Sequence, residues 1–286
     1  MANYDAHLAW LGATTPYESI TVNTRFGFTH VLITGPKDAP SLVLLPSPST
    51  GMAVDWKRSL ASFSKEYRVY AFDLIGGIGK SAPTRLAYDT LDYAIWLLDV
   101  IYALNLGPAS YIGTLSGGWL LLKLATLAPS QIAKAVLLTP LGFLPLPSPF
   151  SIPFKVRVYA TLAQLFPTWK TITPYFREFL SPASMMTQEI FRENVELMLL
   201  YYKYYKPPAV PKPLSEFEQA RLTAPTLLLD GEYNILYKPQ ELMAQARKVL
   251  PNLRAAEIVP NAGGAVLDEQ PAWATARILR FLREGN

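Results

Sequence analysis

The chain contains no cysteine, only two histidines and no long apolar segment. The absence of cysteine excludes disulfides, thiolate catalysis and cysteine-ligated zinc sites. Every stretch of the ~18 residues that a membrane span needs is interrupted by proline or charge, so we expect no transmembrane helix. Residues 1–10 show no basic region followed by an apolar run. We therefore expect no signal peptide and a cytoplasmic location.

Charge of either sign is sparse and dispersed. The 26 Lys and Arg residues are scattered, and the net charge is only +4, so we expect no nucleic-acid partner. No His, Asp or Glu cluster has the spacing of metal ligands, and no cofactor is expected. Half of the residues are apolar, which predicts a large buried core.

Short apolar runs alternate with helical patterns along the chain. The runs that we expect to form strands are 28–33, 42–45, 69–72, 109–112, 135–138, 226–229 and 258–259. Helical patterns fall at 90–106, 117–127 and 272–282. This alternation predicts an α/β fold, with a mainly parallel sheet covered by helices on both faces.

Between residues 140 and 224 the pattern changes to prolines, aromatics and helical segments at 156–165, 171–180 and 188–205. We interpret 140–224 as a helical cap inserted into a core formed by 1–139 and 225–286. Four tyrosines lie on its last helical segment: Tyr201, Tyr202, Tyr204 and Tyr205. They can pack onto the core or line a pocket, because tyrosine joins an apolar body to a polar tip.

Several motifs occur in an order that is typical of one family. Gly113-Thr114-Leu115-Ser116-Gly117 follows an expected strand, opens an expected helix and resembles the nucleophile elbow G-x-S-x-G. The segments 67–81, 224–234 and 260–271 resemble three further turns of the same family. Over residues 42–282 the chain therefore resembles the α/β-hydrolase fold of carboxylesterases and lipases.

The resemblance places the family's Ser, Asp and His triad at Leu115, Asn234 and Gly264. Leu115 carries no hydroxyl group, and Gly264 offers no base. Asn234 has the shape of aspartate without its charge. A triad reaction at these three positions is therefore not expected.

The resemblance also implies two backbone donors for an oxyanion. One is the N–H of Ser116. The other falls in Pro46-Ser47-Pro48, where a proline at the donor position would supply no N–H. A lost donor of this kind costs about 2.7–4 kcal/mol of transition-state stabilisation.

A shifted register leaves an alternative open. Thr114-Leu115-Ser116-Gly117-Gly118 fits T-x-S-x-G and makes Ser116 the nucleophile. Such a serine needs a base, and the chain has only His7 and His30. We expect His7 to be solvated and His30 to pack in an early strand.

These substitutions predict a dry, apolar pocket at the carboxyl ends of the strands, beneath the cap. Its expected lining is Pro46, Ser47, Pro48, Ser49, Thr114, Leu115, Ser116, Asn234 and Gly264. The predicted function is non-hydrolytic: cyclase- or lyase-like action on an apolar small molecule. Three alternatives remain, namely a non-catalytic binder or receptor, a deliberately inactivated hydrolase scaffold, and a residual esterase that uses Ser116. The sequence leaves open whether the protein is an enzyme, what its ligand is and how it oligomerises.

Overall fold

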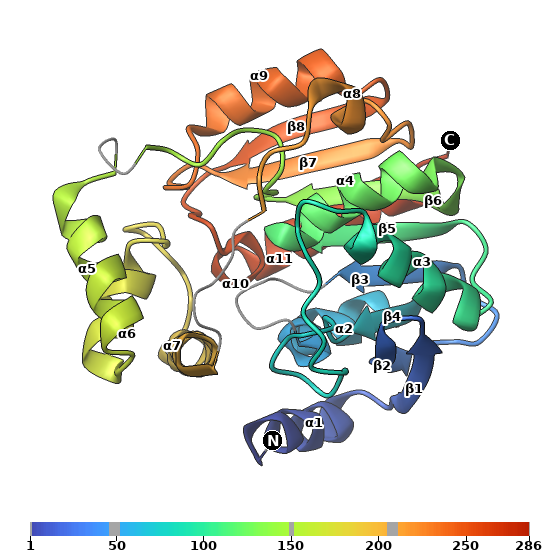
Figure 1. The fold of residues 1–286 in the computed structure, drawn as a ribbon, viewed down its shortest axis with the longest axis horizontal. Helices are drawn as coiled ribbons and strands as arrows, with labels where there is room; N and C mark the ends of the chain where they lie inside the picture. The colour runs from blue at the N-terminus through green and yellow to red at the C-terminus, as the bar shows by residue number, and fades with distance from the viewer. Residues whose placement is uncertain (1, 46–51, 149–151, 205–210, 286) are drawn as a thin grey trace.

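A computed structural model describes residues 2–45, 52–148, 152–204 and 211–285, and Figure 1 shows their arrangement. One eight-stranded sheet has the order β1-β2-β4-β3-β5-β6-β7-β8. β2 is antiparallel to β1 and β4, and all other neighbouring pairs are parallel. The strands are β1 (Glu18–Thr24), β2 (Gly27–Thr34), β3 (Ser41–Leu45), β4 (Arg68–Phe72), β5 (Ala109–Thr114), β6 (Ile132–Leu138), β7 (Thr226–Gly231) and β8 (Leu253–Val259). The predicted fold class is confirmed.

Side chains alternate across the sheet because its strands have a two-residue period. Val43 and Tyr111 belong to the apolar core on one face, which is covered by α3 (Asp92–Ala103), α4 (Ser116–Leu127) and α9 (Pro239–Val249). Leu44 and Ile112 belong to the core on the other face, which is covered by α1 (Ala2–Thr14), α2 (Lys57–Phe63) and α11 (Pro271–Arg283). Apolar strands of this kind are buried on both sides, as the continuous apolar runs predicted.

Six shorter or terminal elements complete the described core. Neither β1 nor α1 was predicted, although Tyr4, Leu8 and Leu11 form a buried stripe at helical spacing. The 3₁₀ turns are η1 (Ala53–Trp56) and η2 (Pro129–Gln131), and the short helices are α8 (Glu216–Gln219) and α10 (Val266–Glu269).

Three of the four helices described between β6 and β7 form a group at one end of the molecule (Figure 1). They are α5 (Phe154–Leu165), α6 (Trp169–Arg177) and α7 (Gln188–Tyr204). They share a small apolar core that includes Ile172, Val195, Tyr201 and Tyr202. Tyr204 is 70% exposed, and Tyr205 falls outside the described residues. We call α5–α7 the cap. α8 instead packs against α4 and α9.

Candidate functional site

The turn between β5 and α4 is sharp and lies at the carboxyl edge of the sheet. Leu115 has φ +49° and ψ −115°, a conformation that costs a non-glycine residue about 1–3 kcal/mol. Two glycines make the turn possible. A Cβ on Gly113 would meet the Gly117 carbonyl oxygen at 2.5 Å, and one on Gly118 would meet the Pro140 Cβ at 2.6 Å. The backbone thus projects residue 115 outward between a strand and a helix, as the motif predicted.

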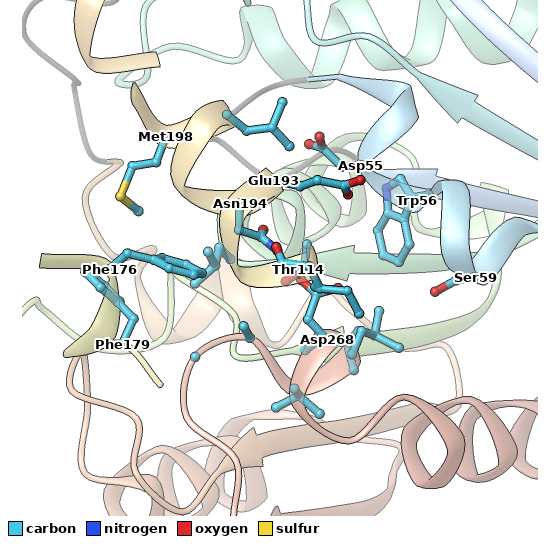
Figure 2. A pocket seen from close by; sticks show the side chains of 18 of the residues that line it. Asp55, Trp56, Ser59, Thr114, Phe176, Phe179, Glu193, Asn194, Met198 and Asp268 are labelled. Atoms are coloured by element: carbon cyan, nitrogen blue, oxygen red, sulfur yellow. Dashed lines mark hydrogen bonds between the residues drawn. The ribbon is translucent and has the colours of Figure 1, made fainter. Parts of the chain in front are cut away.

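A cavity of about 1300 Å³ lies between this edge and the cap. Figure 2 shows side chains from both sides of it, including Phe176, Phe179 and Met198 from the cap and its connections. Ligand pockets in proteins typically enclose about 300–1,000 Å³, so this cavity can hold a bulky molecule. Aromatic and aliphatic side chains dominate its cap wall.

The structure brings some of the expected site residues to this cavity. Thr114, Leu115 and Gly264 line it. Ser116 begins α4, is 6% exposed and is absent from the cavity wall, as is Asn234, which is 7% exposed. Four further expected residues lie outside the described residues: Pro46, Ser47, Pro48 and Ser49.

Asn234 is held by a local hydrogen-bond network. Its Nδ2 donates to Oδ1 of Asp230 over 2.7 Å, and its Oδ1 accepts from the Leu236 N–H over 2.9 Å. Asp230 is fully buried at the end of β7. Burial raises its pKa to about 7, while the hydrogen bonds that it accepts from Asn234 and from the Gly231 N–H oppose this shift. Asp230 is therefore protonated in the folded protein at mildly acidic pH.

We expect Asp230 to make the protein less stable as pH rises. Its carboxyl group titrates near pH 3.8 when unfolded and near pH 7 when folded, so between these values the folded state binds more protons. Its stabilising contribution is complete below about pH 3.8 and is lost as the pH rises to about 7. The loss amounts to at most about 4 kcal/mol. Urea unfolding of wild type and Asp230→Asn at about pH 4 and about pH 8 measures it. An identical pH dependence in both proteins would contradict the assignment.

His7 was expected to be solvated, and that expectation is wrong. His7 is 9% exposed and lines the cavity, because α1 packs it against α2. Its Nδ1 lies 2.7 Å from Lys57 Nζ, and Lys57 also pairs with Glu193 of the cap at 2.9 Å. Burial, together with the charge of Lys57, lowers the pKa of His7. A lysine ammonium group can only donate a hydrogen bond, so His7 Nδ1 accepts it and His7 Nε2 carries the ring hydrogen. The imidazole of His7 therefore offers a donor to the cavity and no free base.

Two aspartates not singled out by the sequence analysis also line the cavity. Burial and the charge of Asp73 raise the pKa of Asp55 well above its usual range. Burial likewise raises the pKa of Asp268, while the charge of Arg58 opposes that shift. Oδ2 of Asp268 accepts a hydrogen bond from Asn194 Nδ2 of the cap over 3.3 Å (Figure 2). The side chain of Asp268 is half-buried and lines the cavity. Carboxyl groups with raised pKa values suit acid–base work near neutral pH.

The loop before α10 is fastened to the cap by one carboxylate. Glu269 accepts the N–H of Gly263 and the N–H of Ser181, each over 2.7 Å. The Gly264 N–H donates to the Phe179 carbonyl over 2.7 Å. The backbones of this loop and of the segment after α6 are therefore in direct contact. This contact fixes the cavity wall next to Asp268.

Two neighbouring glycines in this loop should respond differently to alanine. A Cβ on Gly263 would overlap the Phe179 carbonyl oxygen, whereas one on Gly264 would meet it at an ordinary 3.6 Å. We expect Gly263→Ala to lower the free energy of unfolding by about 1–3 kcal/mol. Gly264→Ala should stay within about 0.5 kcal/mol of wild type. Denaturant unfolding of the matched pair measures the difference, and equal stabilities would contradict the close approach.

His30 lies outside the cavity wall, in a buried network centred on Asp73. His30 Nδ1 is 2.9 Å from Oδ2 of Asp73, and Ser19 Oγ is 2.8 Å from His30 Nε2. Oδ1 of Asp73 accepts the Ala53 N–H over 2.6 Å, and Oδ2 accepts the Lys80 N–H over 2.7 Å. Asp73 thus fixes the turn after β4 and the start of η1, whose residues line the cavity.

Within the described ranges, no group of three or more His, Cys, Asp or Glu side chains could hold a metal ion. None of the helices described there has the length and apolarity to cross a membrane.

Known proteins resemble this chain over nearly its whole length. Two proteins of Bacillus subtilis (strain 168) match in sequence. "Uncharacterized carboxylesterase nap" is 30% identical over 92% of this chain and 86% of that protein. "Carboxylesterase YbfK" is 31% identical over 94% and 88%, respectively. The crystal structure of naproxen esterase from Bacillus subtilis superposes with a TM-score of 0.80 at 28% identity, covering 99% of this chain and 98% of that one.

These relatives correct the functional prediction. The expectation of a triad-less pseudo-hydrolase acting as a cyclase, lyase or non-catalytic binder is wrong, because the relatives are named carboxylesterases. That expectation rested on the three triad positions and the oxyanion segment Pro46-Ser47-Pro48, whereas the likeness extends over more than nine-tenths of the chain. Of the alternatives left open, ester hydrolysis is the class that the relatives support.

The family model of the "Alpha/beta hydrolase family" matches residues 42–277, which include the elbow, the cap and the loop before α10. The superposition with the esterase structure also extends over 99% of this chain. The chain therefore belongs to the alpha/beta hydrolase family.

Proposed function

We propose that the protein hydrolyses carboxylic esters with bulky apolar groups inside the cavity beneath the cap. The observation that carries the proposal is the half-buried Asp268, which lines the cavity together with the mainly apolar cap wall. The names of the relatives support the reaction class. The aromatic cap wall, with Tyr175, Phe176 and Phe179, supports an apolar substrate.

In this proposal Asp268 acts as a general base on water. Its carboxylate takes a proton as the water oxygen attacks the ester carbonyl carbon. The C–O bond to the alcohol then breaks, and the departing oxygen takes the proton back, so that a carboxylic acid and an alcohol leave. Thr114, Leu115 and Gly264 are proposed to contact the substrate, since they line the same cavity.

The N-terminus of α4 would stabilise the negative carbonyl oxygen formed in this step. The twelve-residue helix begins at Ser116, directly after the cavity-lining Leu115. The first N–H groups of a helix have no partner within it, and the helix dipole places positive charge there. Donors aimed at developing charge are among the largest contributions to catalysis.

Ester hydrolysis with Ser116→Ala separates this proposal from a serine mechanism. The substrates would be p-nitrophenyl esters of acetate, benzoate and an arylpropionate. We expect turnover by wild type, favouring the aryl acids, and less than about a threefold change in kcat/KM in Ser116→Ala, because Ser116 is absent from the cavity wall. Loss of activity in Ser116→Ala would transfer the reaction to that serine, and no turnover of any ester by wild type would refute the proposal.

The rate should increase with pH. Only the ionised form of Asp268 can accept a proton, and burial holds its pKa above the usual range, so kcat/KM should rise as pH passes through that raised value. The profile would be measured from about pH 4 to about pH 9. A rate that is flat or falls across this range would contradict a carboxylate base.

A cytoplasmic location and a cap domain bounded by residues 140 and 224 remain proposals.

A further inference from the structure

One helix of the cap is apolar on the side that faces away from the molecule. Figure 1 shows α5 at the outer edge of the cap, away from the sheet. Six large apolar side chains on and just after this helix are 37–72% exposed: Phe154, Val158, Leu162, Leu165, Phe166 and Trp169. The first four are spaced by four, four and three residues, so they share one side of the helix. We call these six residues the outer α5 face.

Folding of the cap does not require this face. The opposite side of α5 carries Val156 and Ala163, which are 4% and 0% exposed. Ala160, Thr161 and Gln164 line the cavity. The outer face contributes no residue to the buried cap core. A contiguous exposed apolar patch of this kind is typical of an interaction surface.

Cations predominate in the segment that carries the face. Residues 152–177 contain four cations, Lys155, Arg157, Lys170 and Arg177, and no Asp or Glu, although the chain has 22 acidic residues. Lys155 pairs with Glu178 at 3.0 Å. Arg157 lies 5.4 Å from the centre of the Phe154 ring. Lys170 is exposed and follows Trp169 directly.

We propose that the outer α5 face docks on a lipid surface with anionic headgroups. Phenylalanine, leucine and tryptophan on one helix side, flanked by lysine and arginine, match the boundary between acyl chains and negative headgroups. The helix would lie in this boundary without crossing the membrane. The proposal does not depend on which reaction the cavity performs.

Charge argues against a second copy of the chain as the occupant. A two-fold symmetric contact through this face would place the same patch on both partners. Lys155 pairs with Glu178, but the other cations of residues 152–177 would then face cations. Like charges across an interface disfavour the complex, whereas anionic headgroups complement them.

Vesicle flotation tests the proposal with the full chain. The probes are vesicles of phosphatidylglycerol and phosphatidylcholine in equal parts, and vesicles of phosphatidylcholine alone. We expect wild type to float with the anionic vesicles. Its partitioning should fall at least about tenfold on neutral vesicles or in high salt. Binding should also shift the Trp169 fluorescence emission to the blue.

The double variant Phe154→Ser/Leu165→Ser should reduce partitioning onto anionic vesicles at least tenfold. Phe217→Ser is the matched control, because Phe217 is 78% exposed on α8, outside the outer α5 face, and should leave binding unchanged. All these side chains are exposed, so circular dichroism should show that each variant folds. No flotation of wild type, or equal flotation of the double variant, would overturn the proposal. A dimer in light scattering that the double variant abolishes would also overturn it.

Discussion

The double substitution Leu115→Ser/Gly264→His should raise kcat/KM for ester hydrolysis at least about 100-fold above wild type. The elbow at Leu115 projects its side chain to the cavity, and Gly264 lines the same cavity. A Cβ at residue 264 meets only ordinary contacts, at 3.6 Å and 3.8 Å from Phe179, so the backbone there accepts a side chain. A positioned base typically contributes about 10²–10⁴-fold to such a reaction.

The gain should require both changes. A serine hydroxyl without a base is a weak nucleophile, and an imidazole without the hydroxyl has nothing to activate at the elbow. Leu115→Ala/Gly264→His is the matched control, since it carries the imidazole and the smaller residue 115 without the hydroxyl. Steady-state kcat/KM with one p-nitrophenyl ester compares wild type, Leu115→Ser/Gly264→His and Leu115→Ala/Gly264→His. Equal rates for the Ser/His and Ala/His variants would show that the two positions do not face each other.

Removal of the Asp73 carboxylate by Asp73→Ala should lower the free energy of unfolding by about 3–5 kcal/mol. Asp73 is 0% exposed and ties α1, β2, η1 and the turn after β4 together. Its loss would leave the Tyr4 hydroxyl and the N–H groups of Ala53 and Lys80 buried without this acceptor. Each such donor costs about 1–3 kcal/mol.

Tyr4→Phe provides the graded control for this cluster. It removes one donor, whose oxygen lies 2.8 Å and 2.9 Å from the two Asp73 oxygens, and leaves the carboxylate with its other partners. We expect a loss of about 1 kcal/mol. Urea unfolding measures both variants. A similar small loss in Asp73→Ala would mean that water replaces the carboxylate and that the cluster does not hold these elements together.

Local pattern was sufficient for most of the fold. Continuous apolar runs predicted the inner strands because those strands are buried on both faces, and the glycine spacing around Leu115 predicted a strand, a sharp turn and a helix. β1 was not predicted because it is an edge strand, with Val22 as its single buried residue among the alternating polar ones. The helical stripe Tyr4, Leu8 and Leu11 was available as a signal for α1.

The site was harder to predict because its chemistry depends on contacts between distant segments. His7 reaches the cavity through contact with Lys57, fifty residues away. Asp268 of α10 accepts a hydrogen bond from Asn194 of the cap, which lies 74 residues earlier in the chain. No spacing in the sequence encodes these contacts. Asn234 was expected in the pocket, but its side-chain amide donates a hydrogen bond to Asp230, four residues earlier in the chain.

The most direct test of the account is the hydrolysis of an aryl ester by wild type and by Asp268→Asn. Asparagine keeps the shape of the side chain but cannot take a proton from water. Asp38→Asn, an exposed aspartate outside the cavity wall, is the matched control. We predict that kcat/KM falls at least about 100-fold in Asp268→Asn and is unchanged in Asp38→Asn. Equal kcat/KM in wild type and Asp268→Asn would contradict the account.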